Sequence, residues 1–217
     1  SITAGETIKG FPSGKEAIIP SMAKLLYQGH ASLRIQTDEA KVIYIDPYAG
    51  DGYDLPADLV LITHEHYDHN AIHLVPCGER TIVIRAKDAL KGGVYHAFSY
   101  FGVEIQAVPA GNANHDPKEC VGYLLSLDGK TIYVAGDTDY FPAMEDIGKK
   151  GVDYCFLPID GVFNMGPEEA TRCAEIIKPK HLIPYHMHPG MLFDIKQDMK
   201  VSYPNSLLVR PGQIIEL

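Results

Sequence analysis

The protein has 217 residues, of which 46% are hydrophobic and 22% are charged, a composition that supports one domain with a sizeable core. Nineteen Lys and Arg residues oppose 28 Asp and Glu residues, so the formal net charge is −9. A surface this acidic repels phosphate backbones, which argues against a nucleic-acid-binding protein. No apolar run approaches the ~18 residues that a membrane span requires, so an integral membrane protein is excluded as well.

The segment 1–21 is rich in Gly, Lys, Thr and Pro and is predicted to be an extension that precedes a single domain over residues 22–217. It contains no apolar stretch of the kind found in signal peptides. We therefore expect a cytoplasmic protein, and a periplasmic or secreted one only if an upstream signal has been removed.

Strand patterns dominate the first third of the chain. The short connections between the first three strands favour antiparallel pairing, and the continuous apolar run that follows is typical of a strand buried on both faces. An Asp128-Gly129 pair predicts a hairpin in the middle of the chain. The predicted strands are 24–28, 32–37, 41–45, 58–63, 81–84, 103–108, 121–127, 131–135, 154–157, 181–183, 206–209 and 214–215.

Helical patterns lie between the later strands, and the clearest covers 167–177. Pro167 suits the first helical position, two glutamates follow it, and the apolar residues recur at helical spacing until Pro179 ends the pattern. Weaker helices are predicted at 69–74, 87–90 and 142–149. Strands first, then alternating strands and helices, predict an α/β (α+β) fold with two packed sheets and helices outside, four layers in all.

The most informative segment reads His64-Glu65-His66-Tyr67-Asp68-His69 and directly follows the buried strand. His64 and His66 are two residues apart, so in extended backbone their side chains point to the same side. Burying this much imidazole and carboxylate is costly unless the groups are paired or bind metal. The segment therefore predicts a metal site at a strand end.

Three later residues supply the further ligands that a second metal would need. His115 follows the strand ending at residue 108, Asp137 follows the strand 131–135, and His186 follows the strand 181–183. Each alone is typical of a turn or of a solvated loop. Together they place ligand-type side chains at several strand ends, where functional residues gather in layered α/β folds.

In this order, the 64–69 segment and the three later residues resemble the motif set of the metallo-β-lactamase fold hydrolases. Within that superfamily the sequence is most similar to the small bacterial lactonase-like (UlaG-like) hydrolases. The likeness to that subgroup rests on the segments Gly29-His30-Ala31-Ser32, Asp46-Pro47 and 164–170. The resemblance extends from about residue 22 to residue 217.

The resemblance implies a four-layer αββα sandwich with a dinuclear site. His64, His66 and His115 would bind one metal, Asp68, His69 and His186 the other, and Asp137 would bridge them. Zn is expected first, with Mn, Fe or Ni as alternatives. A hydroxide shared by the two metals would attack an ester, lactone or phosphodiester of a small molecule. Asp68 would in addition orient this nucleophile or carry its proton.

Several assignments stay open in the sequence. His188 lies two residues after His186 and could replace it as the ligand, although the Pro184-Tyr185-His186 step favours His186; otherwise His188 is a candidate substrate contact. His30 is a second candidate substrate contact, or a structural histidine. Asp46 is expected to orient one of the ligand histidines, or else to cap its strand.

Three other functions compete with a hydrolase of a small-molecule substrate. A di-iron oxidoreductase on the same fold would favour a carboxylate at position 66, where this chain has His66. A nuclease would favour a basic surface. A non-catalytic metal-binding module would not need all seven ligands. The pocket is expected between the loops 48–55, 98–102, 112–114, 140–141 and 160–165. The sequence does not indicate an oligomeric state.

Overall fold

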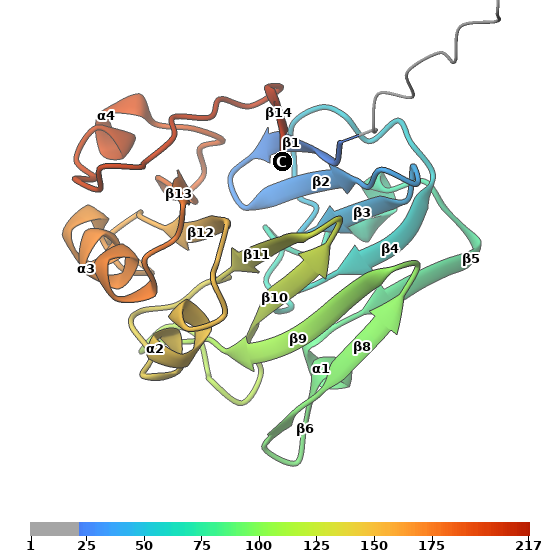
Figure 1. The fold of residues 1–217 in the computed structure, drawn as a ribbon, viewed down its shortest axis with the longest axis horizontal. Coiled ribbons are helices and arrows are strands. Elements are labelled where there is room, and N and C mark those ends of the chain that lie inside the picture. Colours follow the sequence, from blue (N-terminus) through green and yellow to red (C-terminus); the bar gives the residue numbers. More distant parts are fainter. Residues whose placement is uncertain (1–21) are drawn as a thin grey trace, which may run out of the picture.

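The computed structural model describes residues 22–217, so the predicted extension 1–21 lies outside the described residues. Two six-stranded sheets face each other, one built from the first third of the chain and its last strand, the other from the later strands (Figure 1). Within residues 22–217, no helix combines the length and apolar character needed to cross a membrane.

The first sheet has the strand order β14-β1-β2-β3-β4-β5. Its pairings are antiparallel from β14 to β3 and parallel from β3 to β5. Its strands are β1 (Lys24–Gly29), β2 (Ser32–Gln36), β3 (Val42–Ile45), β4 (Ala57–Leu61), β5 (Cys77–Ile84) and β14 (Ile214–Glu216).

The second sheet repeats this pattern with the order β8-β9-β10-β11-β12-β13. Its pairings are antiparallel from β8 to β11 and parallel from β11 to β13. Its strands are β8 (Ala97–Tyr100), β9 (Val103–Pro109), β10 (Val121–Leu127), β11 (Lys130–Val134), β12 (Tyr154–Pro158) and β13 (His181–Tyr185). A small hairpin, β6 (Leu90–Lys91) and β7 (Val94–Tyr95), protrudes beside it (Figure 1).

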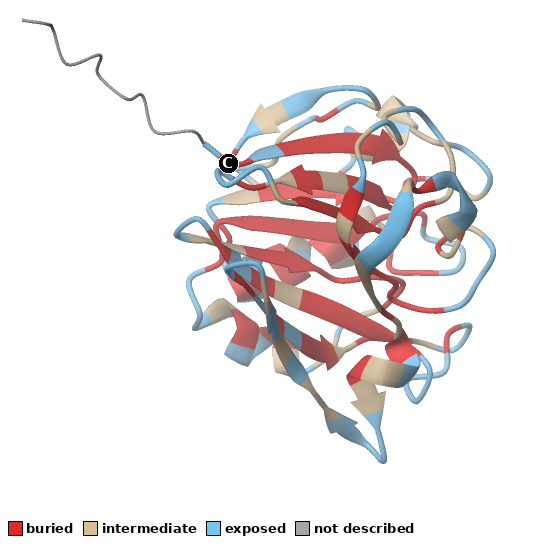
Figure 2. Ribbon diagram, turned by 90° about the vertical axis from the view of Figure 1, so that its right-hand side faces the viewer, coloured by how far each residue is buried: buried red, intermediate tan, exposed pale blue. Residues whose placement is uncertain are grey.

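The main core lies between the two sheets. Apolar side chains that alternate along β1, β2 and β9, such as Leu25, Leu33 and Ile105, belong to one continuous buried cluster. Figure 2 shows the strands largely buried and the connecting loops largely exposed. The two sheets are also hydrogen-bonded at one end, where the Val121 amide donates to the Thr63 carbonyl oxygen at 3.0 Å.

The two outer faces are covered differently. Helices α2 (Ala143–Gly148) and α3 (Pro167–Ile177) pack on the second sheet, where Ala170, Cys173 and Ala174 of α3 are buried as the helical spacing predicts. The outer face of the first sheet is covered by the short 3-10 helix η1 (Ile72–Leu74) and by Tyr53 and Leu55 of a loop. Two one-turn helices complete the fold, α1 (Ala86–Ala89) and α4 (Ile195–Asp198).

The mixed α/β sandwich predicted from the sequence is confirmed, with differences in a few elements. The strand predicted at 206–209 is wrong, because the segment makes only one isolated bridge, between Leu182 and Ser206. The helix predicted at 69–74 is reduced to η1. Residues 98–102 are not a pocket loop, since they form most of β8 and the turn into β9, and Phe98 packs against the core.

Candidate metal centre

The predicted ligand residues meet at one end of the two sheets, where several strands stop. β4 leads into the 64–69 segment, and β9, β11 and β13 lead to His115, Asp137 and His186 respectively. Parallel strands present their carboxyl ends at the same edge, so residues far apart in sequence converge there. The convergence follows from the strand order of both sheets.

Asp137 lies at the centre of the group. Its carboxylate oxygens are 3.1 Å from His115 Nε2, 3.2 Å from His69 Nε2, 3.3 Å from His186 Nε2 and 3.9 Å from His64 Nε2. The side chain of Asp137 is only 4% exposed. A buried carboxylate that faces four imidazole nitrogens from both sheets is positioned to bridge two cations.

The nitrogens that face Asp137 are short of hydrogen bonds. Among the described residues, Nε2 of His64, His69 and His186 and Oδ1 of Asp137 have no hydrogen-bond partner, although all are buried. Burying such groups without a partner costs roughly several kcal/mol of folding free energy. A cation held between them would give all of these atoms a partner. Imidazole and carboxylate together are the ligand set of Zn²⁺ and related transition metals. The residues present therefore fit a metal centre.

The ligand atoms form three overlapping groups, of which the third, His64, His69 and Asp137, links the other two. The ring nitrogens of His64, His66 and His115 lie within 4.8 Å of one another and form the first group. The ligand atoms of the second group also lie within 4.8 Å of one another. This group includes His30, which the resemblance does not count as a ligand. Its members are His30, Asp68, His69 and His186.

The histidines of the first sheet are oriented by a buried carboxylate, as predicted for Asp46. Asp46 Oδ2 accepts hydrogen bonds from His69 Nδ1 at 2.8 Å and from Thr63 Oγ1 at 2.6 Å, and Asp46 Oδ1 accepts from the Thr63 amide at 2.8 Å. Thr63 Oγ1 also lies 3.0 Å from His64 Nδ1. Asp46 thus leaves Nε2 of His69 free to face the centre.

The histidines of the second sheet have supports that sequence reasoning missed. Asp160 Oδ2 is 3.0 Å from His186 Nδ1, and Asp160 Oδ1 accepts hydrogen bonds from the backbone amides of residues 162–164. Asn112 Oδ1 lies 3.0 Å from His115 Nδ1. Asp160 follows a buried strand, as Asp46 and Asp137 do, and that shared position is the signal that could have identified it.

The carboxylates set the pKa values of the buried groups. Burial lowers the pKa of His64 to about 2, and the neighbouring His69 acts in the same direction. Burial would also lower the pKa of His186, but Asp137 and Asp160 outweigh it and raise that pKa to about 9. Burial opposes ionisation of Asp137, yet the imidazoles around it keep its pKa well below the usual range. The buried carboxylates of the centre therefore stabilise positive charge next to them, whether it is carried by protons or by metal ions.

The backbone near the centre is strained. His30, Asp46 and His186 have φ values of 53°, 47° and 44°, in the left-handed region that residues with a side chain rarely adopt. Such strain persists where the surrounding structure fixes the conformation, and it is concentrated at functional sites.

A cavity of about 580 Å³ opens onto the centre. Asp68, Asp137 and His186 line its floor, and Tyr67 and Phe163 line its mouth, with 73% and 48% of their surfaces exposed. A cavity of this size accommodates a small molecule. Of the loops predicted to frame the pocket, 112–114 and 160–165 contribute to its lining through Asn114 and Phe163.

The two candidate substrate contacts lie in different surroundings. His188 is exposed, and its Nδ1 lies 2.9 Å from the carbonyl oxygen of Pro189, away from the ligand atoms. His186, in contrast, faces Asp137. His30 is fully buried beneath Asp68, so its ring does not line the cavity. Among the described residues, the groups of potential ligand atoms do not include His73, His96 or His181.

Comparison with known proteins gives one family. A model of the beta-lactamase superfamily domain matches residues 24–186. A UPF0173 metal-dependent hydrolase from Thermococcus onnurineus is 31% identical, with 90% of this chain and 100% of the relative covered. Another from Geobacillus sp. is 32% identical, with 89% and 100% covered. The structure of Igni18, a metallo hydrolase from Ignicoccus hospitalis, superposes with a TM-score of 0.70 over 90% of this chain and 98% of that one, at 22% identity.

The chain belongs to the beta-lactamase superfamily. It is a metal-dependent hydrolase, as the 64–69 segment and the strand-end residues predicted. Its His and Asp cluster is able to bind metal. The likeness to Igni18, at its low identity, supports the fold.

Proposed function

We propose that this hydrolase uses two divalent metal ions, with Zn as the first choice, to hydrolyse a neutral ester or lactone of a small molecule. His64, His66 and His115 would hold one ion, Asp68, His69 and His186 the other, and Asp137 both. The observation that carries the proposal is the approach of four imidazole nitrogens to the one buried carboxylate of Asp137.

When bound, such ions lower the pKa of water to about 7 and polarise the oxygen of the electrophile. Asp137 lies between the two ligand groups. Asp46 and Asp160 hold His69 and His186 in the orientation in which Nε2 faces the centre. Asp68 lines the cavity with 19% of its side chain exposed, so its carboxylate can accept a proton from the nucleophile and return it to the leaving group.

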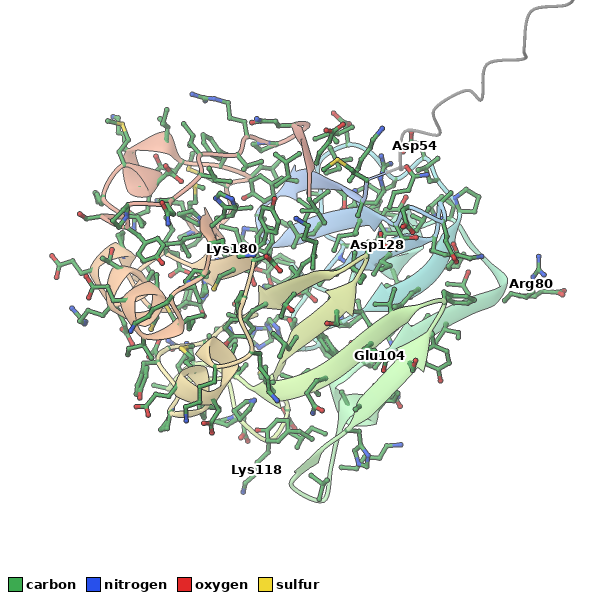
Figure 3. The ribbon with its side chains drawn as sticks, in the orientation of Figure 1. Asp54, Arg80, Glu104, Lys118, Asp128 and Lys180 are labelled. Atoms are coloured by element: carbon green, nitrogen blue, oxygen red, sulfur yellow. The ribbon has the colours of Figure 1, made fainter. Side chains whose placement is uncertain are left out.

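The lining of the cavity favours an uncharged substrate. Among the described residues that line it, there is no Lys or Arg to pair with a phosphate or carboxylate group, while Glu65 adds negative charge. Lys118, at the lower edge of the molecule in Figure 3, lines a neighbouring cavity together with Lys87, and not this one. Tyr67 and Phe163 offer apolar surface at the mouth, which suits an acyl chain or a ring.

The test is an activity screen on lactones, carboxylic esters, thioesters and phosphodiesters, with the metal-free protein reconstituted with Zn or Mn separately. We expect hydrolysis of a lactone or ester that depends on added metal. Hydrolysis of phosphodiesters alone would contradict the proposed substrate class. Activity that is the same before and after removal of the metal would contradict the metal-dependent mechanism.

A further inference from the structure

His30 lies in the turn between β1 and β2 and touches the second ligand group. Its side chain is buried, its ring centroid lies 3.9 Å from that of His186, and its Nε2 lies 2.9 Å from Asp68 Oδ2. The ligand set that the family resemblance implies does not include His30. The role of His30 is therefore inferred from its contacts.

Both ring nitrogens of His30 have a close polar neighbour. His30 Nδ1 lies 3.2 Å from the carbonyl oxygen of Met191, which can accept a hydrogen bond from a hydrogen on Nδ1. In the neutral ring, Nε2 then presents a lone pair to Asp68, whose carboxylate also presents lone pairs. With the hydrogen on Nδ1, a cation placed beside these two atoms, which lie 2.9 Å apart, would bind both.

The geometry of the second ligand group suits a metal ion. A neutral His30 that donates its Nε2 lone pair to the metal adds no charge. The ligand atoms of His30, Asp68, His69 and His186 all lie within 4.8 Å of one another, as ligands of one ion require.

The position of His30 in the fold supports the same role. β1 and β2 in the first sheet occupy the places that β9 and β10 occupy in the second. The β9–β10 connection carries His115, a member of the first ligand group, and the β1–β2 connection carries His30. His30 also adopts a φ of 53°, a strained conformation that a merely space-filling residue would have no reason to keep.

We infer that His30 is a ligand of the second metal, which would then be held by His30, Asp68, His69 and His186 besides the shared Asp137. This inference rests on the second metal site of the proposed function. It makes the two sites unequal, because the first is held by three histidines and the shared Asp137. The second site should therefore fill first when metal is added to the metal-free protein.

The variants His30→Ala and His30→Gln separate a ligand from a positioning residue. The Gln side chain can still donate a hydrogen bond to Asp68, but its amide nitrogen cannot bind a metal. For each variant, metal affinity is measured with Zn or Co in competition with a chelator, without substrate. The control is His73→Gln, which replaces an exposed histidine outside the cluster.

For a ligand, both His30 variants should weaken the tighter of two metal-binding steps by more than about 100-fold, beyond the 10–100-fold that loss of a supporting hydrogen bond costs. The cobalt form of the wild type should also differ from both variants in its visible spectrum. If His30→Gln binds both ions as the wild type does, the inference is overturned. If the wild type itself binds fewer than two ions, the proposed dinuclear function fails instead.

A crystal structure of the metal-loaded wild type gives an answer that does not depend on the variants folding. We expect His30 Nε2 about 2.0–2.1 Å from the second ion, the usual Zn–N distance. A nitrogen beyond bonding distance, with a hydrogen bond to Asp68 in its place, would overturn the inference.

Discussion

The two sheets share one strand pattern but contribute to the centre in different ways. The first sheet supplies His64, His66, Asp68 and His69 from a single segment after β4. The second supplies His115, Asp137 and His186 one at a time, from three separate strand ends. In both, a buried carboxylate after a strand orients a histidine, Asp46 for His69 and Asp160 for His186.

This difference shows where local sequence suffices and where topology is needed. The first sheet builds half of a metal site from six consecutive residues, so its chemistry can be read directly. The second sheet builds the other half only because β11, β12 and β13 run parallel and end together. Asp137 joins the halves, since its carboxylate faces histidines of both sheets.

Asp137→Ala should have the largest effect, because it removes the carboxylate that faces four imidazole nitrogens from the two sheets. We expect hydrolysis to fall by more than about 100-fold, beyond the cost of losing a supporting residue, and two-metal loading to be lost. The measurements are kcat/KM and metal content, with Asp146→Ala on the exposed face of α2 as the control. An active variant that keeps two metals would contradict the bridging role.

His186→Ala and His188→Ala compare two neighbouring histidines of the second sheet. His186 Nε2 lies 3.3 Å from Asp137, whereas His188 is exposed and contacts Pro189. His186→Ala should remove about one metal per chain, as measured by elemental analysis, and His188→Ala should leave the metal content unchanged. The reverse result would exchange their assignments.

Asp46→Ala tests the support of the first sheet. The change removes the acceptor for His69 Nδ1 and for two hydrogen bonds from Thr63. Metal affinity should fall by about 10–100-fold, the range found for residues that support ligand histidines. A chelator titration measures it, and affinity equal to that of the wild type would show that the ligands of the 64–69 segment need no support.

Asp160→Asn is a milder test of the second sheet. The amide oxygen can still accept hydrogen bonds from the backbone of 162–164, but the negative charge next to His186 Nδ1 is lost. We expect metal affinity to fall by about 10-fold, less than for Asp46→Ala. A larger loss than for Asp46→Ala would reverse the order of the two supports.

Asp198, in α4, is a partly buried carboxylate outside the candidate metal centre. Burial raises its pKa to about 6, and its Oδ1 has no hydrogen-bond partner among the described residues. Because the folded state holds this proton more tightly than the unfolded chain, stability should fall as the pH rises from about 4 to about 6. Asp198→Asn should remove this dependence and add about 1 kcal/mol at pH 7, after allowance for its partial exposure.

Thermal unfolding at several pH values measures the effect of Asp198→Asn. Wild-type stability that does not change between pH 4 and pH 6 would show that Asp198 is ionised freely, as a solvated carboxylate is.

The sequence predicted α3 and most of the strands, because their apolar spacing is continuous, but it missed β6, β7 and β8. It also identified the 64–69 segment, because ligand-type residues are dense there. It did not reveal Thr63, Asn112 or Asp160 as supports of the ligand histidines, because their contacts there form only in the folded chain. It likewise placed a strand at 206–209, where apolar residues pack against the core but only one isolated bridge, from Ser206 to Leu182, joins the segment to the second sheet.

The account depends on two metal ions held by residues from both sheets. The most direct measurement is anomalous X-ray diffraction at the absorption edge of the metal in crystals of the reconstituted protein. We predict two peaks, one between His64, His66 and His115 and one beside Asp68, His69 and His186, with Asp137 between them. A single peak, or none near Asp137, would contradict the account.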